Sequence, residues 1–473
     1  MNEPVLTVHK VGGGALRNPE DFGQVAEVLR QSPGANVIVV SALHGVTDEL
    51  LRAARRAADG ARPAALEALR FLQDRHATWA RRLLQPPGLT QFLRFYDRLH
   101  RNAQSILSSI ARLRETPPAA MDRLLSLGEL SSSYMLTLFL RQQGFASAWA
   151  DARRLIQTNN QHGHAQPLFP ETRLRTREVL TALLREGIVP VVPGFIGRSA
   201  AGRTTTLGRG GSDLTATLIA VILKATRVVL WTDVAAIMSA DPRLVPTAFT
   251  IPAVPYEEAV LLAKLGVKRF HPEMLEFVYR QGIPVIIRSL KDLQAPGTTI
   301  HMDARLPDGP HVIAHLPHVT LVRLEYALPL RRPLLRLLRA LYREFRPLAV
   351  MAQQWPPTIT LLISGTQVPE SLREKPGRLR AKRVHVTTAG LIMIVGQNLR
   401  SYLSTDDIVP GPARVLHEWA TDAAIPVLVP TEQLTDLVRT IHDRCFAESM
   451  RDARCGMRGG RCELQSGNLG AES

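Results

Sequence analysis

Short apolar runs alternate with longer segments of helical periodicity over the first 300 residues. Runs such as 37–40, 188–192 and 228–231 are continuously apolar and end in small or polar residues, which is typical of strands buried on both faces of a parallel sheet. The segment 49–115 instead has apolar residues at helical spacing, broken only by a few prolines and glycines, and it predicts helices at the edge of that sheet. The pattern therefore predicts an α/β domain with a mostly parallel central sheet flanked by helices.

After residue 305 the elements become shorter and follow a different order. A linker is expected at 307–310, followed by two small α+β units. The expected elements are strand 319–325, helix 334–345, strands 348–353 and 358–364, then strand 390–396, helix 412–424, strand 425–429 and helix 431–446. The end of the chain is rich in Gly, Arg and Ser and predicts disorder. The predicted organisation is thus a domain at 1–305, a two-unit region at 306–446 and a tail at 447–473.

Composition narrows the class of protein. A chain of 473 residues exceeds what one core usually supports, and 45% hydrophobic with 21% charged residues indicates a globular protein. No apolar run is long enough to span a membrane, and the N-terminus lacks the features of a signal peptide. We expect a cytoplasmic protein without membrane contact. The three cysteines all lie after residue 440 and lack metal-ligand spacing in the body of the chain, so no disulfide framework or metal site is predicted.

The formal charge of +16 raises the question of nucleic-acid binding. The basic residues are mostly Arg spread over amphipathic helices, aromatic residues make up 5% of the chain, and no nucleic-acid-binding motif occurs. We interpret the charge as compositional bias that helps to attract an anionic nucleotide and an acidic substrate. Nucleic acid is not an expected partner.

Residues 204–217 have the composition of an anion site. A glycine-rich turn that carries Arg209, Ser212 and Asp213 runs directly into a segment, 214–225, with good helix composition. Glycines allow backbone N–H groups to approach a ligand, and a helix N-terminus adds partial positive charge. The alternative is an ordinary glycine-rich loop in which Ser212 or Asp213 caps the helix.

The N-terminal strand ends in a second glycine turn, led by Lys10. Strand, Lys-Val-Gly-Gly turn and helix form a candidate phosphate cradle, although it is not a Walker P-loop because the Lys precedes the glycines. Ser41 and Thr47 follow the next buried strand, at the edge where ligands bind in open α/β sheets. Glu129 opens a later helix. Each of these last three residues also has a structural explanation, as a turn former or a first-turn acid.

Eight motifs occur in an order that resembles aspartate kinase, of the amino acid kinase fold. They are Lys-x-Gly-Gly, Val-Ser-Ala-x-x-Gly-Val-Thr, Gly-Glu, Gly-Phe-Ile-Gly, Thr-x-Leu-Gly-Arg-Gly-Gly-Ser-Asp, Trp-Thr-Asp-Val, Asp-Pro-Arg and Lys-x-x-His-Pro. The resemblance covers residues 5–301. It implies transfer of the ATP γ-phosphoryl group, with Mg²⁺, to the β-carboxylate of L-aspartate, the first step in making lysine, threonine and methionine.

The resemblance also implies a role for each matching residue. Lys10, Asp213 and Lys268 would be catalytic. The substrate-binding residues would be Ser41, Thr47, Glu129, Arg209 and Ser212, and the nucleotide-binding residues Lys10, Val11, Gly12, Gly13, Thr232, Asp233, Met238, Arg243, Lys268 and Arg269. Two alternatives are another carboxylate or carbamate kinase of the same fold, and a catalytically weak amino-acid sensor. The three catalytic residues argue against a sensor, because a sensor needs no phosphoryl-transfer charges.

The chain also departs from the family pattern. Gly14 and Ala15 replace two hydroxyl residues, and Ala236 and Met238 replace a Gly and a Tyr, so nucleotide affinity is expected to suffer more than turnover. The two C-terminal units resemble the paired ACT domains through which many aspartate kinases respond to lysine or threonine, but 326–333 lacks the usual Gly-containing turn. Two interpretations stay open for this region, an amino-acid effector site and a scaffold for a homodimer.

Overall fold

The computed structural model describes residues 5–233, 236–265, 272–326, 338–339, 341, 347–354, 357–366, 381–404, 408–411 and 413–456. The chain divides into two compact units. The first lies within residues 1–237 and 250–305, and the second within 238–249 and 306–473. The segment 238–249 thus belongs to the second unit by its contacts, although the sequence pattern gave no reason to separate it from the first.

An eight-stranded sheet forms the centre of the first unit, in the order β11-β13-β12-β8-β1-β2-β5-β3. The strands are β1 (Leu6–Val11), β2 (Ala35–Val40), β3 (Ser147–Trp149), β5 (Val189–Pro193), β8 (Arg227–Thr232), β11 (Ala253–Val254), β12 (Val285–Ser289) and β13 (Thr298–Ile300). Every neighbouring pair is parallel except β12 with β13. The prediction of a mostly parallel sheet is therefore confirmed.

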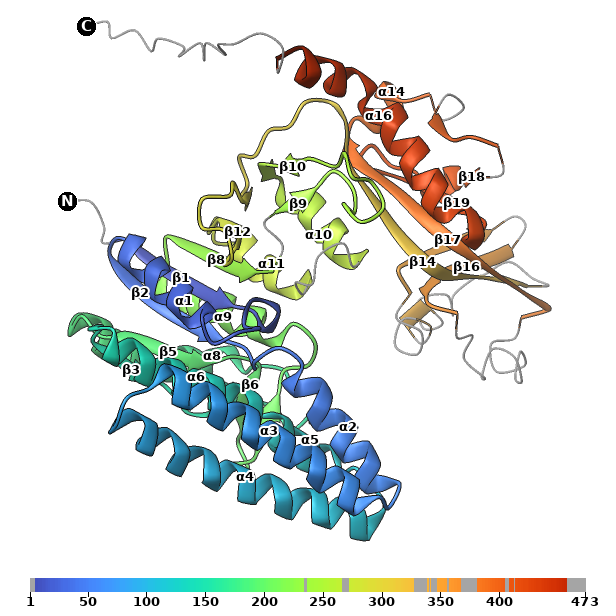
Figure 1. Ribbon diagram of the computed structural model, residues 1–473. Coiled ribbons are helices and arrows are strands. Elements are labelled where there is room, and N and C mark those ends of the chain that lie inside the picture. Colours follow the sequence, from blue (N-terminus) through green and yellow to red (C-terminus); the bar gives the residue numbers. More distant parts are fainter. Residues whose placement is uncertain are drawn as a thin grey trace, which may run out of the picture. The chain divides into compact units, whose positions relative to one another are not determined.

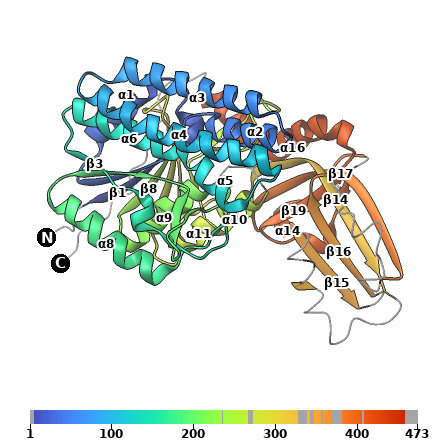
Figure 2. The same cartoon turned by 90° about the horizontal axis from the view of Figure 1, so that it is seen from below.

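Helices cover both faces of this sheet, as buried parallel strands require (Figures 1 and 2). One face is covered by α1 (Asp21–Gln31) and α6 (Leu127–Gln142). The other is covered by α8 (Phe169–Arg185) and α9 (Gly211–Leu223), with α11 (Pro272–Tyr279) against α9 and α10 (Tyr256–Lys264) against α11.

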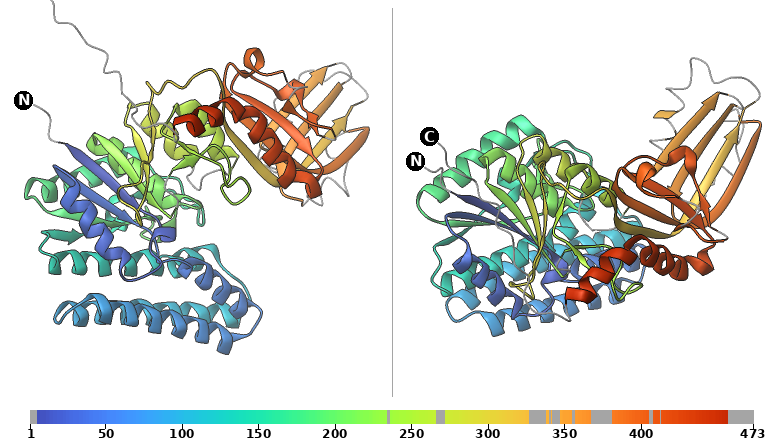
Figure 3. Two further views of the ribbon diagram at one scale, coloured as in Figure 1. Left: turned by 45° about the horizontal axis from the view of Figure 1, so that its top comes forward. Right: turned by 90° about the horizontal axis from the view of Figure 1, so that it is seen from above.

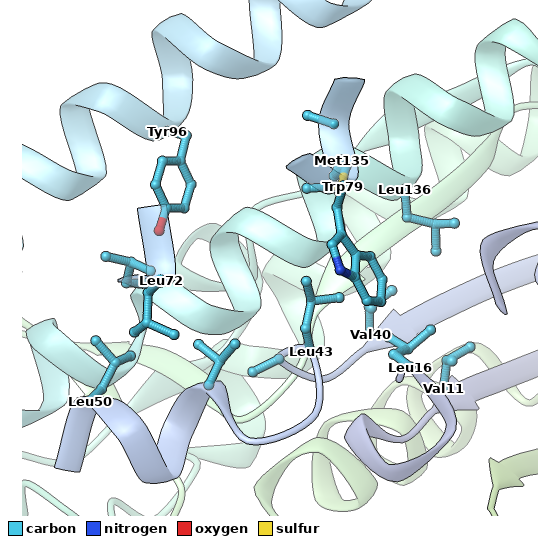
Figure 4. Close-up of a cluster of buried hydrophobic side chains, with 14 of the residues drawn as sticks. Val11, Leu16, Val40, Leu43, Leu50, Leu72, Trp79, Tyr96, Met135 and Leu136 are labelled. Carbon is cyan, nitrogen blue, oxygen red and sulfur yellow. The ribbon is translucent and has the colours of Figure 1, made fainter. Parts of the chain in front are cut away.

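A helical layer lies outside α6, where the periodicity of residues 49–115 predicted helices. It consists of α2 (Val46–Ala58), α3 (Arg62–Leu83), α4 (Gly88–Leu113) and α5 (Pro118–Leu125). The long helices α3 and α4 run side by side, in blue in the left view of Figure 3. Buried apolar side chains join this layer to the sheet in one cluster, in which Trp79 lies near Leu43 and Val40, and Leu72 lies near Leu50 (Figure 4).

A small three-stranded sheet immediately precedes the glycine-rich loop. It contains β4 (Gln157–Thr158), β6 (Ile196–Ser199) and β7 (Thr204–Thr206), and the short helix α7 (Ala152–Leu155) precedes β4. Strands β6 and β7 form an antiparallel hairpin, the last element before the loop. The remaining short strands β9 (Ile237–Met238) and β10 (Thr250–Ile251) stand at the two ends of segment 238–249.

The second unit contains a six-stranded antiparallel sheet in the order β15-β16-β14-β17-β19-β18. Its elements are β14 (Gly309–Glu325), β15 (Ala349–Gln354), β16 (Pro357–Ser364), β17 (Arg383–Gln397), β18 (Arg414–Val415), β19 (Ala424–Val429), α14 (Leu399–Tyr402) and α16 (Leu434–Gly456). The long strands β14 and β17 pair along their whole length (Figure 2). One apolar cluster lies around α16 and a second lies around β14 and β16.

Three expectations for this unit need correction. The linker expected at 307–310 overlaps the start of β14 at Gly309. The predicted helix at 412–424 is wrong, because Arg414 and Val415 pair with β19 and residues 417–419 form a 3-10 turn. An available sheet edge supplied hydrogen bonds that outweighed the local helix composition. Helix α16 continues to Gly456, into the tail predicted to be disordered from 447. Most of the predicted helix 334–345, and residues 457–473, lie outside the described residues.

Candidate active site

The turn after β1 holds Lys10 against Asp213. The Lys10 Nζ atom lies 2.7 Å from Asp213 Oδ1, and the two side chains are only 13% and 5% exposed. A Cβ atom on Gly13 would lie 2.8 Å from the carbonyl oxygen of Ala42, so only glycine permits this close approach. The N–H of Gly12 already donates to the Trp231 carbonyl at 3.0 Å. The amides that follow it, at the start of the 3-10 turn, are therefore better placed than that of Gly12 to bind a ligand.

A buried histidine anchors β1 beside Lys10. Trp231 Nε1 donates to His9 Nδ1 at 3.1 Å, so His9 Nε2 carries the proton and donates to Asn36 Oδ1 at 2.9 Å. Burial lowers the pKa of His9 to about 4, because a charged imidazole is costly in an apolar surrounding. His9 is thus a neutral fixed link between three strands, and it adds no charge to the site.

The glycine-rich loop ends in a helix start without a side-chain cap. Gly208 and Gly210 have φ angles of 78° and 72°, and Gly210 is the N-cap residue of α9. Ser212 and Asp213 lie inside the first turn of α9, so the alternative in which either caps the helix is excluded. The helix N-terminus and Lys10 together stabilise the Asp213 carboxylate.

Glu129, in the first turn of α6, is a buried carboxyl group with spare hydrogen-bonding capacity. Its Oε2 atom has no hydrogen-bond partner in the part of the chain that the structure describes. Burial raises the pKa of Glu129 to about 8, against smaller opposing effects of the Ala42 N–H and the Lys10 charge. The group is therefore mostly protonated near pH 7 until a cation enters beside it.

A cavity of about 330 Å³ brings all the predicted substrate-binding residues together with Lys10 and Asp213. Its lining includes Lys10, Gly13, Ser41, Thr47, Glu129, Arg209, Ser212 and Asp213. The Ser132 hydroxyl donates to the Ser41 carbonyl at 2.7 Å and so ties this turn to α6. Arg209 is exposed and forms no ion pair with any described residue. The cavity thus offers the Arg209 guanidinium, the Lys10–Asp213 pair, the neutral Glu129 carboxyl group and the side chain of Asp48.

Sequence reasoning assigned no role to three lining side chains, those of His44, Asp48 and Phe195. Phe195 has a φ angle of 69°, which is rare for a bulky residue and is held by the packing of its neighbours. Its N–H donates to Thr215 Oγ1 at 3.2 Å, which joins it to α9. The glycines that flank Phe195 at 194 and 197 were the available signal, because Gly194 leaves no room for a Cβ beside Ser212.

Most of the residues expected to bind nucleotide do not line this cavity. The side chain of Val11 lies in the core, which leaves only its backbone for a ligand. Asp233 pairs with Arg17 at 3.1 Å, and a Cβ on Gly14 would lie 3.1 Å from the Asp233 carboxyl carbon. Gly14, where the family carries a hydroxyl residue, therefore lets this carboxylate approach the turn.

The other nucleotide residues lie elsewhere along the chain. Thr232 ends β8. Met238 and Arg243 belong to the second unit, and Asp241 already binds the Arg243 guanidinium at 2.6 Å. Lys268 and Arg269 lie outside the described residues. The nucleotide-binding roles of these residues stay predictions.

A buried carboxylate holds the glycine-rich loop from behind. Asp122, on α5, accepts hydrogen bonds from His162 Nδ1 at 2.6 Å, the Gly163 N–H at 2.9 Å and Thr206 Oγ1 at 2.5 Å. Thr206 immediately precedes the loop, and a Cβ on Gly208 would lie 3.3 Å from the Gly163 carbonyl oxygen. Asp122 thus clamps three chain segments together, and no pattern in the sequence indicated it.

Comparison with known proteins agrees with this geometry. Residues 5–289 match the model of the amino acid kinase family, and the chain belongs to that family. It is 34% identical over 300 residues to lysine-sensitive aspartokinase 3 of Escherichia coli, and 32% identical over 299 residues to a bifunctional aspartokinase/homoserine dehydrogenase 2 of Arabidopsis thaliana. Each match covers 62% of this chain, but only 64% of the first relative and 32% of the second.

Solved structures extend the likeness beyond the kinase domain. E. coli aspartokinase III in complex with aspartate and ADP superposes with a TM-score of 0.81 at 28% identity, over 93% of this chain and 100% of that one. The same enzyme with lysine and aspartate gives a TM-score of 0.74 at 29% identity, over 93% of this chain and 99% of that one. The resemblance to aspartate kinases inferred from the motifs, and the fold that it implied, are confirmed.

Among the residues that the structure describes, every helix is too short or too polar to span a membrane. No group of three or more His, Cys, Asp or Glu side chains in the described ranges could hold a metal ion by itself.

Proposed function

We propose that this protein is an aspartate kinase that transfers the γ-phosphoryl group of ATP to the β-carboxylate of L-aspartate. One observation carries the proposal: the cavity of about 330 Å³ places Arg209, Glu129 and the Lys10–Asp213 pair around one space. A free guanidinium suits an α-carboxylate, and a buried carboxyl group with one unpartnered oxygen suits an α-ammonium. The E. coli relative solved with aspartate and ADP supports this choice of substrates.

Phosphoryl transfer needs positioning and charge more than covalent chemistry by the protein. A carboxylate oxygen of the substrate is already a nucleophile, so no strong base is required. Lys10 would meet the negative charge that spreads over the transferred group, and Asp213, at 2.7 Å, would hold the lysine in place. Lys268 is proposed to serve the β-phosphate, by the resemblance alone.

The residues of the cavity also fit Mg²⁺ as a companion of the nucleotide. Mg²⁺ in kinases is usually held by one or two carboxylates together with substrate phosphates, and not by an all-protein cage. Asp213 is the described carboxylate beside Lys10, and it would contact the ion or one of its waters. The ion would neutralise charge on the phosphates, and Asp213 would orient both cations.

Hydroxamate formation tests the proposal directly. With ATP, Mg²⁺ and hydroxylamine, an acyl phosphate product is trapped as a coloured hydroxamate. We expect product from L-aspartate and little from L-glutamate or N-acetyl-L-glutamate. Preference for either of the latter would assign the protein to another carboxylate kinase of this fold, and no product from any of them would favour an amino-acid sensor.

Aspartate binding should release a proton from Glu129. The carboxyl group has a pKa near 8 in the free protein, and a neighbouring ammonium favours its charged form, so the pKa must fall on binding. At pH 7 we expect up to about one proton released per aspartate bound. Calorimetry in phosphate and in Tris should therefore give different binding enthalpies, and the difference should vanish in Glu129→Gln. Equal enthalpies for the unmodified protein would contradict this role.

Asp122→Asn should weaken aspartate binding more than turnover. The amide has one acceptor oxygen where three donors converge, so the loop that carries Arg209 loses its anchor. We expect the aspartate KM to rise roughly tenfold, about the size of one lost charged hydrogen bond, with kcat within about threefold. Thr205→Val is the matched control, because this buried hydroxyl bonds Thr158 from the other face of the same strand. Equal losses in both variants would mean general destabilisation.

The second unit is proposed to be an ACT-like regulatory and dimerisation region, with lysine or threonine as the candidate effector. The E. coli relative solved with lysine supports an amino-acid effector, and β14–β17 pairing gives the unit one continuous sheet. Truncation after residue 305 is expected to leave a nucleotide-binding fold with a smaller oligomer. Light scattering during size-exclusion chromatography measures this, and an unchanged oligomer would count against a dimerising C-terminal region.

A further inference from the structure

The first unit contains a second cavity, larger than the active-site cavity. Its volume is about 770 Å³, within the range of roughly 300 to 1,000 Å³ usual for small-molecule sites. It lies between α4, α5, the start of α6 and the hairpin of β6 and β7. None of the predicted substrate or nucleotide residues lines it.

One part of this cavity is apolar. Ile106 and Ile110 from α4 face it together with Leu127 and Leu130 from α6. These four side chains are almost fully buried, so they form the wall behind the cavity. The accessible apolar surface comes from Leu99 and Leu113 of α4, which also line the cavity and are partly or largely exposed. This surface can receive a hydrocarbon chain or ring, because apolar groups gain free energy on leaving water.

The other part is basic. Arg123 and Arg203 line the cavity, are exposed, and form no ion pair with any described residue. Arg153 also lines it, but Asp151 binds its guanidinium bidentately, with the shorter contact at 2.6 Å. Arg123 and Arg203 thus present two guanidinium groups without ion-pair partners beside an apolar surface. This combination is complementary to a molecule with an anionic head and an apolar body.

The cavity and the active site share one helix. Leu127 and Leu130 are three positions apart on α6, so they share one face. At about 3.6 residues per turn, Glu129 lies on another side of the same helix, where it lines the active-site cavity. The two spaces are therefore separate sites on opposite sides of α6.

We propose that this second cavity is a binding site for a small soluble carboxylate with an aliphatic body. The head would lie between Arg123 and Arg203, and the body would lie on the accessible apolar side chains of α4, Leu99 and Leu113. The site stands on the lining of the cavity alone, and it does not depend on the proposed kinase activity.

Octanoate is a suitable probe, and binding to the full chain can be followed by calorimetry. We expect saturable binding at one site, with octanamide and acetate at least about tenfold weaker, because each lacks one of the two features recognised. Affinity should rise about two- to fourfold per methylene from butanoate to octanoate. Absence of saturable octanoate binding would overturn the proposal.

Four variants locate the site. Arg123→Gln/Arg203→Gln should weaken octanoate binding about tenfold or more, while Arg173→Gln/Arg177→Gln, which removes equal charge from exposed positions of α8, should not. Ser109→Trp, which fills the cavity from α4, should abolish binding without unfolding the protein, since Ser109 is only half-buried. Arg209→Gln should leave binding intact.

Two results would reject the assignment. Loss of octanoate binding in Arg209→Gln, with binding kept in Arg123→Gln/Arg203→Gln, would place the ligand in the active site. A smaller oligomer in Ser109→Trp, with no octanoate binding by the unmodified protein, would assign this face to a second copy of the chain.

Discussion

Lys10→Ala should reduce kcat of the proposed kinase reaction by roughly a hundredfold or more, which corresponds to about 2.7 kcal/mol of transition-state stabilisation. In the transition state, negative charge spreads over the equatorial oxygens of the transferred group and must be met by positive groups already in place. Lys10 is a largely buried cation on the lining of the cavity. The aspartate KM should change by only a few-fold, because Lys10 is not assigned to the amino acid.

Asp213→Asn should cause a similar loss by an indirect route. A carboxylate next to phosphates is repulsive unless a cation stands between them, so Asp213 must act through Lys10, 2.7 Å away, and through Mg²⁺. If the pair acts as one unit, the double variant should be little worse than the worse single variant. Strictly additive losses would show that the two residues work independently.

Steady-state kinetics with a coupled ADP assay measures these effects. Lys264→Ala is the control, since this exposed lysine on α10 forms no ion pair among the described residues. Thermal melting must accompany the assay, because removing Lys10 leaves Asp213 buried without its partner and lowers stability as well. A folded Lys10→Ala protein with near-normal kcat would contradict the phosphoryl-transfer role of Lys10. It would then favour the alternative that the protein is an amino-acid sensor.

Arg209→Lys should raise the aspartate KM far more than the ATP KM. Arg209 lines the cavity with a free, exposed guanidinium, whose planar fork can grip a carboxylate with two parallel hydrogen bonds. Lysine keeps the charge but cannot reproduce that geometry. The expected loss is on the order of 1.5 to 3 kcal/mol, the size of a charged hydrogen bond, and therefore roughly ten- to 150-fold in kcat/KM.

The measurement is a pair of saturation curves, one for each substrate at a saturating level of the other. Arg173→Lys, on the exposed face of α8, controls for general effects of the exchange. A rise in the ATP KM without a rise in the aspartate KM would place Arg209 on the nucleotide side and require a new partner for the α-carboxylate.

The sequence was sufficient to predict the sheet and most of the cavity lining. Continuous apolar runs specify buried parallel strands, and the carboxyl ends of such strands meet at one edge of a sheet. Lys10 and Ser41 therefore had to lie near each other once β1 and β2 were recognised as parallel neighbours. The glycine-rich loop before α9 likewise carried its own signal, because Gly208 and Gly210 adopt backbone angles that few other residues tolerate.

Other features depend on contacts between residues that are far apart in the chain. The pKa of Glu129 comes from burial by its surroundings, and nothing in a Gly-Glu pair indicates how deep it will lie. Asp122 binds Thr206 across 84 positions of sequence. Residues 412–424 have helical composition, but Arg414 and Val415 pair with the edge of the sheet at β19. Segment 238–249 joined the second unit, where Ser239 bonds His442 across 203 positions.

The amino-acid sequence by itself thus determined the order of strands and helices in the first unit, the two glycine turns and the family of the chain. Local chemistry suffices for these, because periodicity and turn residues act over a few positions. The tertiary structure alone decided which carboxyl group is neutral, what clamps the glycine-rich loop and where the second cavity lies. Burial and long-range hydrogen bonds arise only when distant segments pack, and their free energies exceed the local preferences of any one segment.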